Sequence, residues 1–272
     1  MPGRPIPIAV TIAGSDSGGG AGIQADIKSM SANGVYAASI ITALTAQNTL
    51  GVTAIHDVPA DFITAQIDAV FSDLDVAAVK IGMLSRAETI AAVADGLRRH
   101  RAQNIVLDPV MVAASGDPLL HDEAVAALVS ELFPLATLIT PNLHEAARLT
   151  GMKVAESRKE MAAQADELAL MTIGAILLKG GHGASGEAED VLVSEIGHKW
   201  FSAPRIDTAN THGTGCSLSS AIAAHLALGK PLADAVGAAK KWLTGAIAAS
   251  DALQVGRGHG PIHHFHELWR GD

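Results

Sequence analysis

The sequence predicts an α/β protein with a doubly wound, mostly parallel sheet covered by helices on both faces. A short apolar strand pattern, a polar turn and a helix pattern alternate five or six times along the 272 residues. This alternation is typical of parallel strands joined by right-handed crossovers. Hydrophobic residues make up 49% of the chain and charged residues 17%, so a large core can form. Because no linker-like tract or internal repeat divides the chain, we expect one domain over residues 1–272.

The expected elements follow from local patterns taken in chain order. Residues 8–13 form an apolar run that leads directly into a glycine-rich loop. Residues 59–74 carry apolar side chains at helical spacing behind Pro59, a residue favoured in the first turn of a helix. We expect strands at residues 8–13, 38–44, 76–81, 105–107, 137–139 and 175–178, a hairpin pair at 191–193 and 200–201, and helices at 23–32, 59–74, 87–100, 122–132, from 144 onward, 157–171, 214–228 and 233–249.

Charge and composition exclude several classes of partner. The net charge is −9 and no run of lysine or arginine occurs, which argues against nucleic acid or an anionic membrane as a partner. The single cysteine excludes an internal disulfide framework and suits a reducing compartment. Apolar runs are too short to span a bilayer, and the run at residues 6–13 is too short for a secretion signal. We expect a cytoplasmic protein.

The turn at residues 210–217 is the first candidate site, since it opens a small-residue helix pattern. Two glycines at a helix start leave backbone N–H groups exposed, and a helix N-terminus attracts anions. Cys216 lies inside this turn, where a thiolate is favoured and the pKa of the thiol is expected to fall. The alternative is a tight structural turn in which Cys216 fills a small space in the core.

The glycine-rich loop at residues 14–22 is the second candidate. It lacks a phosphate-binding G-x-x-x-x-G-K-[ST] pattern, and no acidic residue closes a second strand where a dinucleotide ribose would need one. We expect a wall that approaches a small ligand closely, with Asp26 about one turn further along the helix. A purely structural turn is the alternative.

The remaining candidates follow other expected strands, because ligands of such sheets bind beyond the carboxyl ends of the strands. Gln47 and Asn48 can offer donor and acceptor groups to a flat heteroaromatic edge, or belong to a solvated loop. Met83 could pack on a ligand face or in the core. Asn142 and Glu145 suit Mg²⁺ held largely through water, or an N-terminal cap.

Three further features concern cations. Lys179 at a strand end indicates a nearby anion. Lys240 or Lys241 could reach a nucleotide, although helix lysines are commonly solvated. The histidines near the C-terminus lack the spacing of a metal site, and we expect this tail to pack or to be solvated.

Six segments and the tail together resemble one known family. They occupy residues 13–26, 41–49, 80–84, 140–143, 178–182 and 210–216, the last being Asn-Thr-His-Gly-Thr-Gly-Cys, and the tail is 260–265. In this order they resemble the hydroxymethylpyrimidine/phosphomethylpyrimidine kinases of thiamine biosynthesis. This family belongs to the ribokinase-like superfamily, which accounts for a doubly wound sheet without the phosphate loop of other kinases.

The resemblance implies two successive phosphorylations by ATP and Mg²⁺. The first acts on 4-amino-5-hydroxymethyl-2-methylpyrimidine and the second on its monophosphate. The family commonly forms dimers, so a homodimer is implied. Carried over by motif, Gln47 binds the aminopyrimidine edge; Gly14, Asp26, Met83 and Val110 line the pocket; Asn142 and Glu145 organise the metal; Lys179 meets the phosphate chain; Gly213, Gly215 and Cys216 hold the transferring phosphoryl group; and Thr211, Thr214 and Lys240 lie near the nucleotide.

The sequence departs from the family pattern at two positions. Ala209 and Ala114 stand where the family usually has lysines near the phosphate path. We expect the absence of these two lysines to affect the reaction rate or the second phosphorylation, and to leave the fold and the substrate class unchanged.

The first phosphorylation also requires a group that removes the proton of the substrate hydroxyl. Sugar kinases of the superfamily carry an aspartate base where this chain has Cys216. We expect Cys216, or an aspartate such as Asp26, to act as a base in the first step only, because a phosphate monoester is already ionised. Rival interpretations are a pyridoxal kinase, a non-catalytic pyrimidine-binding sensor and, most weakly, an NAD-dependent dehydrogenase.

Overall fold

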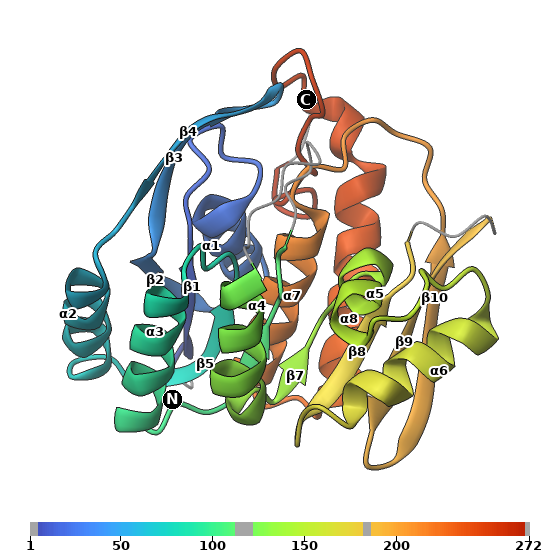
Figure 1. Ribbon diagram of the computed structural model, residues 1–272. Helices are drawn as coiled ribbons and strands as arrows, with labels where there is room; N and C mark the ends of the chain where they lie inside the picture. Colours follow the sequence, from blue (N-terminus) through green and yellow to red (C-terminus); the bar gives the residue numbers. More distant parts are fainter. Residues whose placement is uncertain (1–4, 112–121, 182–185, 270–272) are drawn as a thin grey trace.

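A computed structural model describes residues 5–111, 122–181 and 186–269. The described residues form an eight-stranded sheet with the strand order β10-β9-β8-β7-β6-β5-β1-β2 (Figure 1). The strands from β2 to β8 in this order are parallel, whereas β9 runs antiparallel to both of its neighbours. The parallel strands are β1 (Ile8–Ala13), β2 (Tyr36–Ile41), β5 (Val76–Ile81), β6 (Ile105–Leu107), β7 (Leu138–Ile139) and β8 (Ala175–Lys179).

Helices cover both faces of this sheet, as the sequence predicts. One face is covered by α2, α3, α4, α5 and α6, and the other by α1, α7 and α8 (Figure 1). The α/β prediction is therefore confirmed. The helices are α1 (Gly22–Ala32), α2 (Ala60–Phe71), α3 (Ala87–Arg99), α4 (Asp122–Ala127), α5 (Leu143–Thr150), α6 (Arg158–Ala169), α7 (Thr214–Ala227) and α8 (Leu232–Ala248), with short turns η1 (Leu128–Leu132), η2 (Phe133–Leu135) and η3 (Ser250–Ala252).

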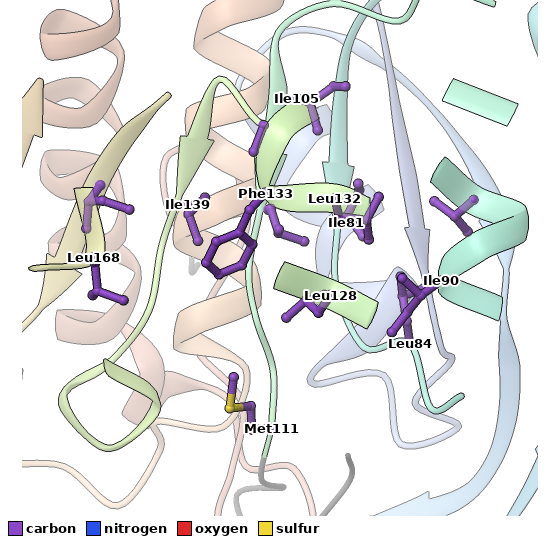
Figure 2. Packing of buried hydrophobic residues seen from close by; sticks show 14 of the residues in the cluster. Ile81, Leu84, Ile90, Ile105, Met111, Leu128, Leu132, Phe133, Ile139 and Leu168 are labelled. Carbon is purple, nitrogen blue, oxygen red and sulfur yellow. The ribbon is translucent and has the colours of Figure 1, made fainter. Parts of the chain in front are cut away.

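The larger of the two cores lies between the sheet and α2 to α6. Figure 2 shows Phe133 of η2 close to Ile139 of β7 and Ile105 of β6, with Leu132 beside it. Burying a side chain of this size contributes roughly 1.5–3 kcal/mol. This packing holds β6 and β7 against η2, and polar side chains follow both strands at their carboxyl ends.

The described residues also form two hairpins, one that extends the parallel sheet and one that is separate from it, and the sequence predicts only the first. The pair β9 (Glu187–Ser194) and β10 (Gly197–Pro204) confirms the predicted hairpin and is longer than expected. The pair β3 (Ala43–Asn48) and β4 (Gly51–Asp57) forms a separate two-stranded sheet, where the sequence indicates the end of a strand and a polar loop. The β3–β4 prediction is wrong because this sheet is largely exposed, so its strands lack the apolar runs of the others.

The tip of the β3–β4 hairpin meets the C-terminal segment, drawn in red at the top of Figure 1. Thr49 Oγ1 accepts hydrogen bonds from the backbone N–H groups of Arg257 and Gly258, each at 3.2 Å. The N–H of His259 donates to the carbonyl of Thr49 at 3.1 Å. In the described ranges, no helix is long and apolar enough to cross a membrane.

Candidate active site

A cavity of about 1220 Å³ opens at the carboxyl ends of the parallel strands. Residues that follow β1, β5, β6 and β8 line it, together with the first residues of α5 and α7, as expected for this class of sheet. Most of the predicted site residues share this lining. They are Gly14, Gln47, Met83, Val110, Asn142, Glu145, Lys179, Thr211, Gly213, Thr214, Gly215, Cys216 and Lys240.

The N-terminus of α7 forms an open end of this cavity. Within the described residues, no side chain caps α7, and its N-cap residue Gly213 is left-handed with φ of 79°. A Cβ on Gly213 would lie 1.9 Å from the carbonyl oxygen of Gly20. Only glycine fits there, so the turn before α7 packs directly against the loop that precedes α1. Uncapped N–H groups at a helix N-terminus favour an anion.

Lys179 lies beside this helix end. Its Nζ is 2.7 Å from Asp108 Oδ1, and a Cβ on Gly215 would lie 3.4 Å from the same Nζ. Burial disfavours the charged amine, but the carboxylates of Asp108 and Glu145 outweigh burial and raise the pKa of Lys179. The ammonium is therefore held charged next to the uncapped amides.

The N-terminus of α5 is closed, in contrast. Asn142 Oδ1 accepts from the N–H of Glu145 at 2.9 Å, and Glu145 Oε2 accepts from the N–H of Asn142 at 2.8 Å. This reciprocal capping box shows that the predicted N-terminal cap is present, and it leaves the predicted metal role of these two residues untested. Burial raises the pKa of Glu145 to about 7; the charge of Asp108 adds to the rise and Lys179 opposes it.

The prediction of a lowered pKa for Cys216 is wrong. Burial raises the pKa of the thiol to about 11, against the opposing charge of Lys80. The carboxylates of Asp26 and Asp108 add to the rise. A helix N-terminus favours a thiolate, but here desolvation and two nearby negative charges are stronger. The thiol is protonated at neutral pH.

Asp26, predicted to line the pocket, lies beneath it. The side chain is fully buried and forms an ion pair with Lys80 at 2.8 Å. Thr11 Oγ1 and Ser220 Oγ also donate to its carboxylate, at 2.6 and 2.7 Å. The structure thus places Lys80, and not Asp26, at the wall of the cavity.

The first glycine-rich loop and β3 also line the cavity. A Cβ on Gly14 would lie 2.5 Å from Met83 Cε, so the loop and this methionine are in close contact. Gln47 pairs with Val52 within the hairpin, and its side chain lies near Thr45 and His212. This loop therefore approaches the cavity closely, as the sequence indicates.

The remaining predicted features divide between the cavity and the surface. Lys240 is 8% exposed and pairs with Asp190 at 2.5 Å, so it is not a solvated helix lysine, whereas Lys241 is exposed. In the tail His263 and His264 are buried and His259 is exposed, so the tail is partly packed and partly solvated. The described ranges hold no cluster of three His, Cys, Asp or Glu residues suited to a metal ion. Ala209 is exposed, and Ala114 lies outside the described residues.

Sequence reasoning missed four polar residues of the site. Asp108 and Lys80 are buried at the ends of β6 and β5, and Asp16 Oδ2 and His212 Nε2 are in hydrogen-bond contact at 2.9 Å between the two glycine-containing turns. Asp108 follows its strand directly, which was an available signal. The pairing of Asp16 with His212 joins residues 196 positions apart and has no local signal.

Solved structures share this fold. Pyridoxal kinase of Bacillus subtilis, in an ADP complex, superposes with a TM-score of 0.88 and 35% identity, covering 96% of this chain and 98% of that chain. Phosphomethylpyrimidine kinase of Clostridium difficile superposes with a TM-score of 0.79 and 44% identity, covering 88% of this chain and 99% of that chain. The fold and the site define a kinase of the ribokinase-like class.

Sequence comparison narrows this class. A family model described as phosphomethylpyrimidine kinase matches residues 16–263. A hydroxymethylpyrimidine/phosphomethylpyrimidine kinase of Rhizobium meliloti is 60% identical, over 97% of this chain and 98% of the relative. The Escherichia coli protein of the same name is 52% identical, over 96% and 98%. The chain belongs to the phosphomethylpyrimidine kinase family.

Proposed function

We propose that this protein phosphorylates 4-amino-5-hydroxymethyl-2-methylpyrimidine with ATP, and then phosphorylates the monophosphate to the diphosphate, in thiamine biosynthesis. One observation carries the proposal: a single cavity joins an uncapped helix end beside Lys179 to a pocket lined by Gln47 and Met83. The first part suits a phosphate chain and the second a flat polar ring. The names of the close relatives support the same activity.

The transfer itself needs charge stabilisation more than covalent help from the protein. The substrate oxygen forms a bond to the γ-phosphorus of ATP as the bond from that phosphorus to the bridging oxygen breaks, and ADP leaves. The amides at the start of α7 and the ammonium of Lys179 face the region where negative charge gathers. Thr211, Thr214 and Lys240 line the same cavity, and we assign them to the nucleotide.

The two steps differ in their need for a base. A hydroxyl must lose its proton, whereas a phosphate monoester attacks through an ionised oxygen. Since the Cys216 thiol is protonated at neutral pH and Asp26 is bound by Lys80, neither is well placed to remove that proton, and we assign it to an oxygen of the transferring phosphoryl group. We therefore assign Cys216 to the phosphate cradle and Asp26 to holding Lys80.

The residues present also fit a magnesium ion. Asp108 and Glu145 both act electrostatically on Lys179, and oxygen ligands held largely through water suit Mg²⁺. When bound, the ion would reduce the negative charge of the phosphate chain. Glu145 and Asn142 would hold it, with Asp108.

The pyrimidine pocket is assigned to Gly14, Gln47, Met83 and Val110. The carboxamide of Gln47 can both donate to and accept from an aminopyrimidine edge. Replacing Gln47 with alanine is expected to raise KM for the pyrimidine far more than KM for ATP. An unchanged KM for the pyrimidine would remove Gln47 from the pocket.

ATP consumption tests the proposal with three acceptors: the hydroxymethylpyrimidine, its monophosphate and pyridoxal. Turnover of both pyrimidines with little turnover of pyridoxal is expected. Preference for pyridoxal would favour the activity of the structural neighbours, and no turnover would favour a binding protein. A slow second step alone would point to the alanines at positions 114 and 209.

The oligomeric state and domain count complete the proposal. We propose that residues 1–272 act as one kinase domain and that two copies form a homodimer, as the family resemblance implies. Sedimentation at micromolar concentration would show a mass of about twice 27.8 kDa. A monomer would contradict the dimer and leave the catalytic proposal intact.

A further inference from the structure

Residues 256–264, near the C-terminus, run from the tip of the β3–β4 hairpin to the start of α7 (Figure 1). Residues 256–259 are exposed, whereas residues 260–264 are buried. We call the whole segment the C-terminal strap. It joins two parts of the chain that both line the cavity, the hairpin and the turn before α7.

The buried half of the strap is fixed to α7 and to the turn that precedes it. The carbonyl oxygen of Gly260 accepts a hydrogen bond from the N–H of His212 at 3.0 Å. His264 Nε2 lies 3.0 Å from Ser217 Oγ, and Ile262 is fully buried in the core formed with α7 and α8. Burial lowers the pKa of His264 to about 3, so its ring is neutral and needs no counter-ion there. These contacts give the buried half one position relative to the turn before α7.

The exposed half of the strap binds the hairpin at Thr49. Thr49 Oγ1 accepts from the N–H groups of Arg257 and Gly258, and the Thr49 carbonyl accepts from the N–H of His259. The two backbones are also in close contact, because a Cβ on Gly258 would lie 2.0 Å from the carbonyl oxygen of Thr49. Consecutive amides of the strap therefore converge on one residue of the hairpin.

The position of the hairpin tip depends on this contact. In the described structure, β3 and β4 pair with each other and with no other strand. Closer to its base, β3 forms hydrogen bonds with Ser15 and Ser17 of the glycine-rich loop, and these end at Gln47. Beyond Gln47, the hydrogen bonds that the described residues show between the tip and the rest of the protein are those at Thr49.

We propose that Thr49 is a positioning residue, which through the C-terminal strap fixes the β3–β4 hairpin relative to α7 and so sets the wall that β4 supplies to the pyrimidine end of the cavity. Thr49 is not part of the cavity lining, whereas Val52 and Ile55 of β4 are. Val52 pairs with Gln47 across the hairpin, so a displaced tip moves this wall. The inference rests on the proposed function, which assigns this end of the cavity to the pyrimidine.

Thr49→Val tests the inference, because valine keeps the shape of threonine and removes the acceptor of two strap amides. KM for both pyrimidines should rise about three- to tenfold, which is roughly the effect of one net hydrogen bond. The values of kcat and of KM for ATP should stay within about twofold of wild type, since the amides of α7 and Lys179 keep their places. Thr49→Ser retains the hydroxyl and should restore KM. A general loss of stability would not divide the two KM values in this way.

The matched control is Thr53→Val in the same hairpin. Thr53 Oγ1 donates to the carbonyl of Ala46 at 2.9 Å, so this variant removes a hydroxyl from the hairpin without removing an acceptor of the strap amides. It should leave KM for both pyrimidines unchanged. An unchanged KM in Thr49→Val, or an equal rise in Thr53→Val, would overturn the inference.

Gly258→Ala disturbs the same contact from the side of the strap. Its Cβ meets the carbonyl oxygen of Thr49 and should raise KM for the pyrimidines at least as much as Thr49→Val does. Because both substitutions act on one contact, the double variant should stay within about twofold of Gly258→Ala alone. Effects on KM that multiply would show two independent contacts and would contradict the inference.

Failure of the proposed function gives a different result. Wild type would then turn over neither pyrimidine, and the inference would fall with it. Turnover of both pyrimidines, with a KM that does not depend on residue 49, contradicts the role of Thr49 alone.

Discussion

Two helix N-termini face the same cavity, and they differ in how their amides are used. The first turn of α5 is capped by its own side chains, Asn142 and Glu145, in a reciprocal pair of hydrogen bonds. The first turn of α7, in the described structure, has no side-chain cap and begins at the left-handed Gly213. A capped helix start can offer only its side-chain oxygens, whereas an uncapped one offers N–H groups. The first therefore suits a cation and the second an anion.

The difference between the two helix N-termini is tested most directly by a substitution that displaces the turn before α7. Gly213→Ala places a Cβ within 1.9 Å of the Gly20 carbonyl oxygen, so the turn must move. Loss of one oxyanion donor costs roughly 10²–10³ in kcat, and loss of the whole turn should exceed about 10³ for both pyrimidines. Turnover with each substrate is the measurement.

The matched control for this variant lies at the other end of the same helix. Gly229 has a similar φ of 82°, and no described atom lies within 4 Å of a Cβ placed there. Gly229→Ala shares the backbone strain of about 1–2 kcal/mol without the clash. If both variants lose activity equally, the open helix end is not the reason.

Removing the cation beside α7 should have the next largest effect. Lys179→Met takes away the ammonium held by Asp108 and is expected to lower kcat by roughly 10²–10³ for both substrates. Lys159→Met, on the exposed face of α6, serves as the control and should not change kcat. A loss confined to the KM for the pyrimidine would place Lys179 at the wrong end of the cavity.

The capped N-terminus of α5 can be tested by the pH dependence of stability, because Glu145 changes its charge near neutral pH. Its folded-state pKa of about 7 lies above its ordinary 4.5, so it contributes stability that is full below pH 4.5 and is lost as the pH rises toward 7. Glu145→Gln keeps an oxygen for the N–H of Asn142 but cannot ionise. Urea unfolding should show the variant gaining stability relative to wild type from pH 5 to pH 8.

A second capping box supplies the control. Glu160 closes the N-terminus of α6 in the same way but is exposed, and hydrogen bonds from the amide of Glu156 and from Ser157 lower its pKa. Its contribution is lost only on acidification below its ordinary pKa. Glu160→Gln should therefore show a constant difference from wild type between pH 5 and pH 8. A similar rise in both variants would contradict burial as the cause.

The smallest effect is expected at Cys216. Because its thiol is protonated at neutral pH, Cys216→Ala should slow both phosphorylations by less than about tenfold and by similar factors. A general base contributes roughly 10²–10⁴. A loss of that size on the hydroxymethylpyrimidine alone, with the monophosphate spared, would restore the base role.

Local sequence patterns predicted the parallel sheet and its helices because both depend on periodicity. Residues 59–74 and 87–100 were expected to be helices, and α2 and α3 lie within those bounds. The β3–β4 hairpin escaped prediction because its two strands pair with each other away from the buried sheet. Alternation of exposed residues there resembles a polar loop.

Site chemistry was less predictable wherever it depends on burial or on distant pairing. The turn sequence predicts a lowered pKa for Cys216, whereas the structure raises it. The cause is burial of the thiol together with the nearby carboxylates, and the sequence of the turn reveals neither. Asp26 lies beneath the cavity because it pairs with Lys80, a residue 54 positions later that itself lines the cavity wall, and no local pattern predicts this pairing. Motifs place residues at a site, but they do not set the protonation of those residues.

The hydrogen bonds between Thr49 and the C-terminal segment have a consequence for the order of folding. Gly258 follows Thr49 by 209 residues, so their contact cannot form until residue 258 has been synthesised. Contacts between residues so far apart in sequence form slowly, because the loop must close first. We expect the amides of residues 45–55 to be the last to gain protection in pulse-labelled hydrogen exchange during refolding, and early protection there would contradict late docking of the hairpin.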